Sequence, residues 1–138
     1  MQKTPLPFEP MTELESMLAD AQRGHLPTAQ LMTALLQSEV YVLGDRALLS
    51  DGSWDEETTL LMLANPAGTP MLAAFTAPER ATDWIGYYPQ YNFGRSARFR
   101  WLVTSAITEM GLVVNPGWAV GWEISPAGMI QLREQVIV

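Results

Sequence analysis

The residue types that most often carry catalysis are scarce in this chain of 138 residues. It has no cysteine, which excludes thiolate nucleophiles and thiolate metal sites. Its single histidine, His25, follows Gly24 between two predicted helices, with no carboxylate at a diagnostic spacing and no G-x-S-x-G motif elsewhere. We interpret His25 as a residue at a helix end. The sequence therefore predicts a protein that is not an enzyme, with only carboxylate chemistry left open, because a fold can assemble carboxylate pairs that spacing does not reveal.

Cofactor and metal motifs are absent as well. Neither G-x-x-x-x-G-K-[ST] nor G-x-G-x-x-G occurs, and the one lysine is Lys3. The acidic run at 51–57 does not have the spacing of a calcium loop, so we interpret it as a solvated loop. We expect no cofactor and no metal.

The chemistry that the sequence does favour is recognition. A long helix predicted for 95–111 places its apolar residues on one face and directs Trp101 to the opposite side, with Arg98 beside it. Arg95 adds to a positive patch in an acidic chain. Since Trp and Arg are enriched at interface hot spots, these three residues predict a protein-interaction surface. The alternative is that the tyrosine-rich segment or the N-terminal leader of the same chain covers Trp101.

Aromatic residues also crowd the segment 87–94, where turn formers separate them. We predict an exposed loop there and assign its aromatic residues to the same interaction surface: Tyr87, Tyr88, Tyr91 and Phe93. A strand at 118–124 alternates large and small residues, which favours a core wall over a binding groove. Glu123, among the small residues, has no ready explanation in a core.

Periodicity and turn signals predict the remaining elements. Thr12 with Glu15, and Thr76 with Glu79, have the spacing of capping boxes at helix starts. Further helices are expected from Pro27 and from Ser125, the second with a return strand at 135–138. The predicted strands are 40–43, 58–64, 71–76, 112–114 and 118–124.

Length and composition set the frame for these elements. The prediction is a single α+β domain with one mixed sheet of about five strands and helices packed on it, spanning 12–138 after a proline-containing leader at 1–11, with no second domain. A net charge of -7 argues against nucleic acid, and the longest apolar run, 60–64, is too short for a membrane span. A cytoplasmic protein with 48% apolar residues is expected, and self-association as a homodimer would fit that composition.

Three short segments resemble a known family: LLQSEVYV at 35–42, FTAPE at 75–79 and LVVNPG at 112–117. Over about 14–132 the chain is similar to the N-terminal domain of the enhanced serine sensitivity (SseB) proteins. That family is bacterial, cytoplasmic as far as its sequences suggest, and named for a growth phenotype without an established reaction. The resemblance therefore implies binding rather than catalysis.

The resemblance also implies a second candidate site. Residues Phe75, Thr76 and Glu79 match its first motif, and Asn115, Pro116 and Gly117 match its second. If both motifs meet at strand ends, the helix amides at 78–80 would receive a carboxylate. The leading prediction is a non-enzymatic regulatory module that binds a protein partner. The alternative is a small-ligand domain that recognises an amino acid or another carboxylate.

Overall fold

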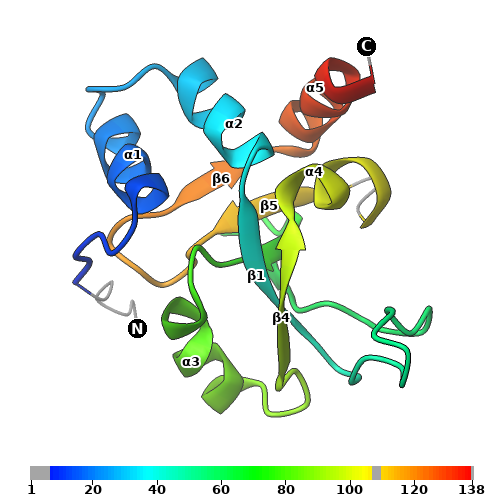
Figure 1. Ribbon diagram of the computed structural model, residues 1–138. Helices are drawn as coiled ribbons and strands as arrows, with labels where there is room; N and C mark the ends of the chain where they lie inside the picture. The colour runs from blue at the N-terminus through cyan, green and yellow to red at the C-terminus, as the bar shows by residue number, and fades with distance from the viewer. Residues whose placement is uncertain (1–6, 107–109, 138) are drawn as a thin grey trace.

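Five α-helices, one π-helical turn and six strands form the described part of the computed structural model, residues 7–106 and 110–137 (Figure 1). In chain order they are α1 (Glu13–Gln22), α2 (Thr28–Leu36), β1 (Glu39–Gly44), β2 (Met62–Ala64), β3 (Pro70–Ala74), α3 (Pro78–Tyr87), β4 (Phe93–Arg98), α4 (Phe99–Trp101), η1 (Leu102–Ala106), β5 (Gly111–Val114), β6 (Trp122–Ile124) and α5 (Pro126–Ile137).

The strands form two sheets. The larger has the order β2-β3-β5-β6, in which β3 and β5 are parallel and the other neighbours antiparallel. The smaller is the antiparallel pair β1-β4, joined to the larger by single bridges from Tyr41 to Phe75 and from Gly44 to Leu60. The predicted α+β class is confirmed. The described strands number six and lie in two sheets, whereas one sheet of about five strands was expected.

The faces of the four-stranded sheet are covered unequally. Because successive residues of a strand point to opposite faces, Leu72 and Leu112 contribute to the main core together with residues of α1, α2, α4 and α5. Ala73 and Phe75 point the other way and pack with Ala81 of α3 in a smaller cluster. Figure 1 shows α3 alone on that side and the other α-helices opposite. One helix of ten residues leaves part of this face uncovered.

Several predicted starts and ends are confirmed. The side chain of Thr12 accepts a hydrogen bond from the Glu15 N–H at 3.1 Å and caps α1. Gly24 ends that helix with φ +80, and the exposed His25 follows it. Ser125 caps α5 by accepting from the Gly128 N–H at 3.0 Å. The predicted strands at 40–43 and 112–114 correspond to β1 and β5.

The predicted helix at 95–111 is wrong in its first turn. Its opening residues belong to β4, which pairs with β1 so that Val42 lies opposite Arg95 and Val40 opposite Ala97. Long-range pairing of the β1 edge outweighs local helical spacing, and helix begins only at Phe99. Arg95 and Arg98 therefore point to opposite sides of a strand, not to one helical face. The end of the predicted helix, 107–109, lies outside the described residues.

Other boundaries also differ from the predictions. The strand expected from Trp118 begins only at Trp122, because the chain is still turning after Gly117. The return strand expected at 135–138 is helical through Ile137, and Val138 is outside the described residues. Helix α3 has ten residues and includes Tyr87, which was predicted to lie in a loop.

Candidate functional site: an aromatic groove beside α3

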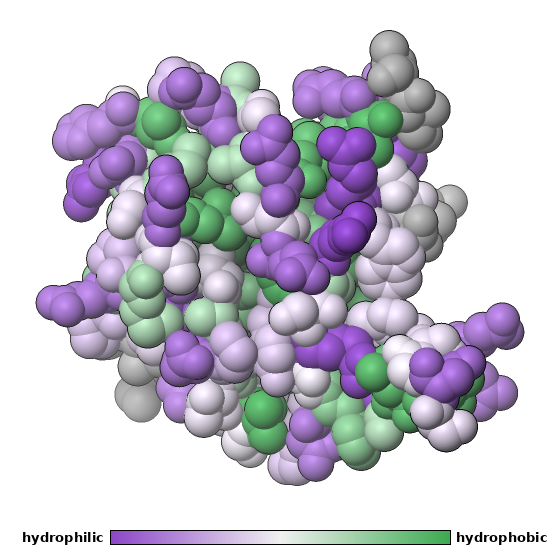
Figure 2. All heavy atoms as spheres, viewed as in Figure 1, coloured by the Kyte–Doolittle hydropathy of each residue, from purple (hydrophilic) through white to green (hydrophobic). Residues whose placement is uncertain are grey.

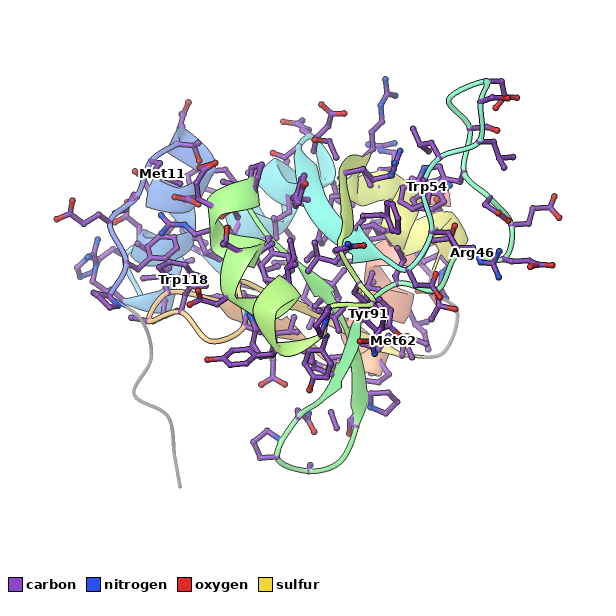
Figure 3. All side chains as sticks on the ribbon, turned by 90° about the horizontal axis from the view of Figure 1, so that it is seen from below. Met11, Arg46, Trp54, Met62, Tyr91 and Trp118 are labelled. Carbon is purple, nitrogen blue, oxygen red and sulfur yellow. The ribbon has the colours of Figure 1, made fainter. Side chains whose placement is uncertain are left out.

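A groove of about 990 Å³ lies over the part of the four-stranded sheet that α3 leaves open. Its floor takes one residue from each strand: Leu63, Met71, Val113 and Glu123. Its walls come from α3 and its C-cap (Asp83, Trp84, Tyr87, Tyr88), from the turn after β5 (Pro116, Gly117, Trp118) and from the β2–β3 hairpin (Met62, Ala64, Asn65, Pro66). In Figure 3, α3 faces the viewer with Trp118 to one side and Met62 to the other, above the hairpin.

The α3 wall is a cluster of aromatic rings. Tyr88 stacks on Trp84 with 6.2 Å between ring centroids, and Tyr87 meets Trp84 edge-on at 5.7 Å. Tyr87 remains 54% exposed and Tyr88 37%. Large apolar side chains gathered at one concave place are typical of a binding surface.

The turn that forms the opposite wall is held in place by both tryptophan side chains. Trp84 Nε1 donates to the carbonyl oxygen of Pro116 at 2.8 Å, and Trp118 Nε1 donates to the carbonyl oxygen of Arg80 at 2.8 Å. The turn itself needs positive φ at Asn115 (+53) and Gly117 (+85), which Asn and Gly adopt most readily. The groove is therefore preformed in the free chain.

Among the residues that the structure describes, the charged ones that line the groove are Asp83 on α3 and Glu123 on β6, and both are acidic. Glu123 Oε1 accepts a hydrogen bond from Asn65 Nδ2 at 3.2 Å, which is a neutral partner. The outward carboxylate that had no explanation in a core thus belongs to the groove.

A buried ion pair supports the groove from behind. Glu15 of α1 is 0% exposed and Arg80 of α3 is 5% exposed. Arg80 donates from Nη2 to Glu15 Oε1 at 2.8 Å and from Nε to Oε2 at 3.0 Å, a two-pronged contact. Burial by itself would raise the pKa of Glu15, but hydrogen bonds from Arg80, Thr76 and the Met11 N–H, with the charge of Arg80, outweigh it and lower the pKa.

Arg80 also fastens the segment before α1 to the groove wall. Its guanidinium lies 3.9 Å from the ring centroid of Phe8 and 4.6 Å from that of Trp118, and it donates to the Glu9 carbonyl oxygen at 2.7 Å. The described part of the predicted leader, 7–11, is thus held against the domain beside Trp118. Residues 1–6 lie outside the described residues.

The depressed pKa of Glu15 predicts acid sensitivity. Because the pKa is lower in the folded chain, its stabilisation is complete above the unfolded-state pKa and is lost as the pH falls through the folded-state value. We expect the free energy of unfolding to fall more steeply below about pH 4.5 in the wild type than in Glu15→Gln, which cannot titrate. Urea unfolding followed at a series of pH values measures this. Equal slopes would contradict it.

The motif residues 75–79 and 115–117 do meet, because β3 and β5 are parallel and end at the same edge. The Thr76 N–H donates to Asn115 Oδ1 at 3.0 Å, and Asn115 Nδ2 donates to Thr76 Oγ1 at 2.9 Å. The second capping box is wrong, however. Ala77 is the N-cap, Thr76 Oγ1 donates to Glu15, and Glu79 is exposed. A carboxylate already lies beside this helix start, and it is the chain's own.

The remaining motif residues have separate positions. Phe75 is fully buried in the smaller core cluster, out of reach of a ligand. Pro116 and Gly117 line the aromatic groove instead of the Thr76 corner.

The residues predicted for the interaction surface divide among three places. Tyr87 and Tyr88 line the groove. Tyr91 packs partly buried against the smaller core cluster. The others lie on the β4–α4 segment: Phe93, Arg95, Arg98 and Trp101. Phe93 is 40% exposed, and Arg98 is exposed opposite Glu39 of β1.

Trp101 is covered by its own chain, and the described segment that stacks on it is neither the tyrosine segment nor residues 7–11 of the leader. Trp54, from the 45–61 loop, stacks on Trp101 with 5.3 Å between centroids, and the Arg95 guanidinium lies 4.9 Å from the Trp54 ring. Figure 2 shows that loop as a lobe standing off the body, with hydrophobic as well as hydrophilic residues. The stack anchors the lobe to α4.

This stack predicts non-additive losses of stability. We expect Trp54→Ala and Trp101→Ala each to lower the free energy of unfolding, and their coupling in a double-mutant cycle to be about 0.5–1.5 kcal/mol, the range for aromatic pairs. Urea unfolding of the four proteins gives the coupling energy. A coupling near zero would mean that the rings do not interact in solution.

Several residues of the site were not found from the sequence. Asp83 and Trp84 lie on α3 and were not singled out in the sequence, although the apolar period over 78–87 was the available signal. Glu15 and Arg80 are 65 positions apart, and no local pattern links them.

The fold and the groove define a class: a small α+β domain with a preformed aromatic site on the open face of its sheet. Residues 14–130, most of the chain, match the family model described as the SseB protein N-terminal domain, and the chain belongs to that family. No curated protein and no solved structure matches it. In residues 7–106 and 110–137, no helix has the length and apolar character to cross a bilayer, and no three His, Cys, Asp or Glu side chains are grouped to hold a metal ion.

Proposed function

We propose that this chain is a non-enzymatic, cytoplasmic interaction module that binds a peptide segment of a protein partner in the groove beside α3. The observation that carries the proposal is the exposure of Tyr87 and Tyr88 beside the open sheet face. Tyr, Trp and Met are enriched at protein interfaces and charged residues are depleted from interface cores. The net charge of -7 supports a protein ligand over nucleic acid.

Preorganisation supports the same proposal. The indole hydrogen bonds of Trp84 and Trp118 fix two walls before any ligand arrives. A binding surface that is already ordered avoids part of the entropic cost of association. The volume of the groove, about 990 Å³, lies at the upper end of the range for small-molecule pockets, roughly 300–1,000 Å³.

The amino-acid or carboxylate alternative has less support. The Thr76 hydroxyl, which would have to bind such a ligand, already donates to Glu15, whose side chain is 0% exposed. A competing carboxylate would have to displace a buried charge from Arg80, which costs several kcal/mol, about 3–5.

A peptide selection tests the proposal. Random peptides of about ten residues, which span roughly 33 Å when extended, are displayed and selected on the immobilised full chain. We expect enriched peptides whose affinity falls about tenfold or more with Tyr88→Ala, as for a hot-spot residue. Phe93→Ala is the matched control, since Phe93 is 40% exposed, close to the 37% of Tyr88, but does not line the groove. No enrichment, or equal losses in both variants, would contradict the proposal.

A further inference from the structure

We infer that the groove selects a segment with a lysine or arginine side chain among apolar residues, and that Asp83 and Glu123 read its positive charge. This inference rests on the proposed function and specifies the chemistry of the occupant, a basic peptide segment of another protein.

The first support is the sign of the charges in the groove. Asp83 stands on the α3 wall beside the exposed aromatic rings, and Glu123 rises from the floor on β6. Both residues are themselves exposed, and the described lining at 62–123 has no basic side chain beside them. Binding of a neutral or acidic segment would cover one or both carboxylates without a counter-charge, which is costly.

The second support is the aromatic surface next to those carboxylates. Ring faces attract cations, and guanidinium groups most often. The chain itself uses this contact on both sides of the molecule: Arg80 lies over Phe8 and Trp118, and Arg95 over Trp54. A lysine or arginine side chain in the groove would be attracted both by a carboxylate and by an aromatic ring face. A neutral or acidic side chain would not gain these two attractions.

The third support is the field of the whole molecule. A net charge of -7 attracts basic segments, and a concave acidic site concentrates that attraction. A basic partner should therefore bind faster at low salt, and its affinity should fall as salt is added.

Charge reversal tests the inference on the peptides that the selection yields. Wild type, Asp83→Lys and Glu123→Lys are compared with Glu79→Lys, an exposed acidic residue on the same helix as Asp83 but outside the groove. Fluorescence anisotropy with each enriched peptide, and with a version in which methionine replaces its basic residues, gives the affinities.

We expect enriched peptides to be rich in Lys and Arg, and Asp83→Lys to weaken their binding about tenfold while Glu79→Lys changes it less than about threefold. For wild-type protein, replacing the basic residues of the peptide with methionine should weaken binding by a similar factor. For Asp83→Lys, the same replacement should change the affinity little. Enrichment of neutral or acidic peptides, or equal effects of Asp83→Lys and Glu79→Lys, would overturn the inference while leaving peptide binding intact. Tyr88-dependent self-association of the pure chain would instead make a second copy the occupant and overturn it too. No enrichment at all would be a failure of the proposed function itself.

Discussion

Replacing Arg80 with methionine is expected to lower the free energy of unfolding by about 3–5 kcal/mol, the cost of breaking a buried ion pair. The substitution removes the two guanidinium donors to Glu15, which is 0% exposed, and leaves its carboxylate without a counter-charge. It also removes the cation between Phe8 and Trp118. The groove wall and the segment before α1 should loosen together.

Urea unfolding measures the loss, with Arg23→Met as the control. Arg23 also pairs with a carboxylate, Asp20 at 2.7 Å, but its side chain is 62% exposed, so removing it should cost less than about 1 kcal/mol. A combined Glu15→Leu and Arg80→Met protein should recover part of the stability, since an apolar pair needs no counter-charge. An Arg80→Met loss as small as that of Arg23→Met would show that the pair is not buried in solution.

Phe75→Ala is expected to cost about 3–5 kcal/mol, the range for emptying a large aromatic site in a core. Phe75 is fully buried, and its bridge to Tyr41 joins the two sheets. The effect distinguishes a core residue from the ligand-binding role that its motif suggested, because a ligand contact would be lost with little change in stability.

Phe93→Ala provides the comparison for this prediction. Phe93 has the same side chain but is 40% exposed on β4, so we expect a loss below about 1 kcal/mol in the same unfolding experiment. A small loss at Phe75 would place that side chain at a surface and weaken the separation of core and groove on this face of the sheet.

The elements that the sequence predicts well are those fixed by nearby residues. Thr12 caps α1, Gly24 ends it, and Ser125 caps α5, each through contacts within a few positions. The strand β4 was missed because its pairing with β1, 49 to 59 positions away, overrides a helical spacing of arginines and apolar residues.

The same distinction explains the candidate site. Tyr87 and Tyr88 were predicted as recognition residues because aromatic crowding is visible in the sequence. The groove needs four further contributions that tertiary structure alone brings together: the hairpin after β2, the turn after β5, Glu123 of β6 and the pair of Glu15 with Arg80. Trp101 was predicted to face a protein partner, but Trp54 of the same chain stacks on it. The polar composition of the loop that holds Trp54 had predicted a solvated segment without such a contact.

Membership of the SseB N-terminal domain family gives these features a common frame without giving them a reaction. The two family-like motifs meet at the ends of β3 and β5, where they hold Glu15 and shape the turn beside the groove. In this chain the two motifs thus position the walls of the groove that we propose as a binding surface.

The most direct test of that surface is an NMR titration of the ¹⁵N-labelled chain with the strongest selected peptide, followed through the indole N–H signals. Trp84 and Trp118 line the groove, whereas Trp54 and Trp101 stack on each other elsewhere. We predict that the signals of Trp84 and Trp118 shift with saturation while those of Trp54 and Trp101 stay in place. Shifts confined to Trp54 and Trp101 would contradict the groove as the binding site and move recognition to the face of α4.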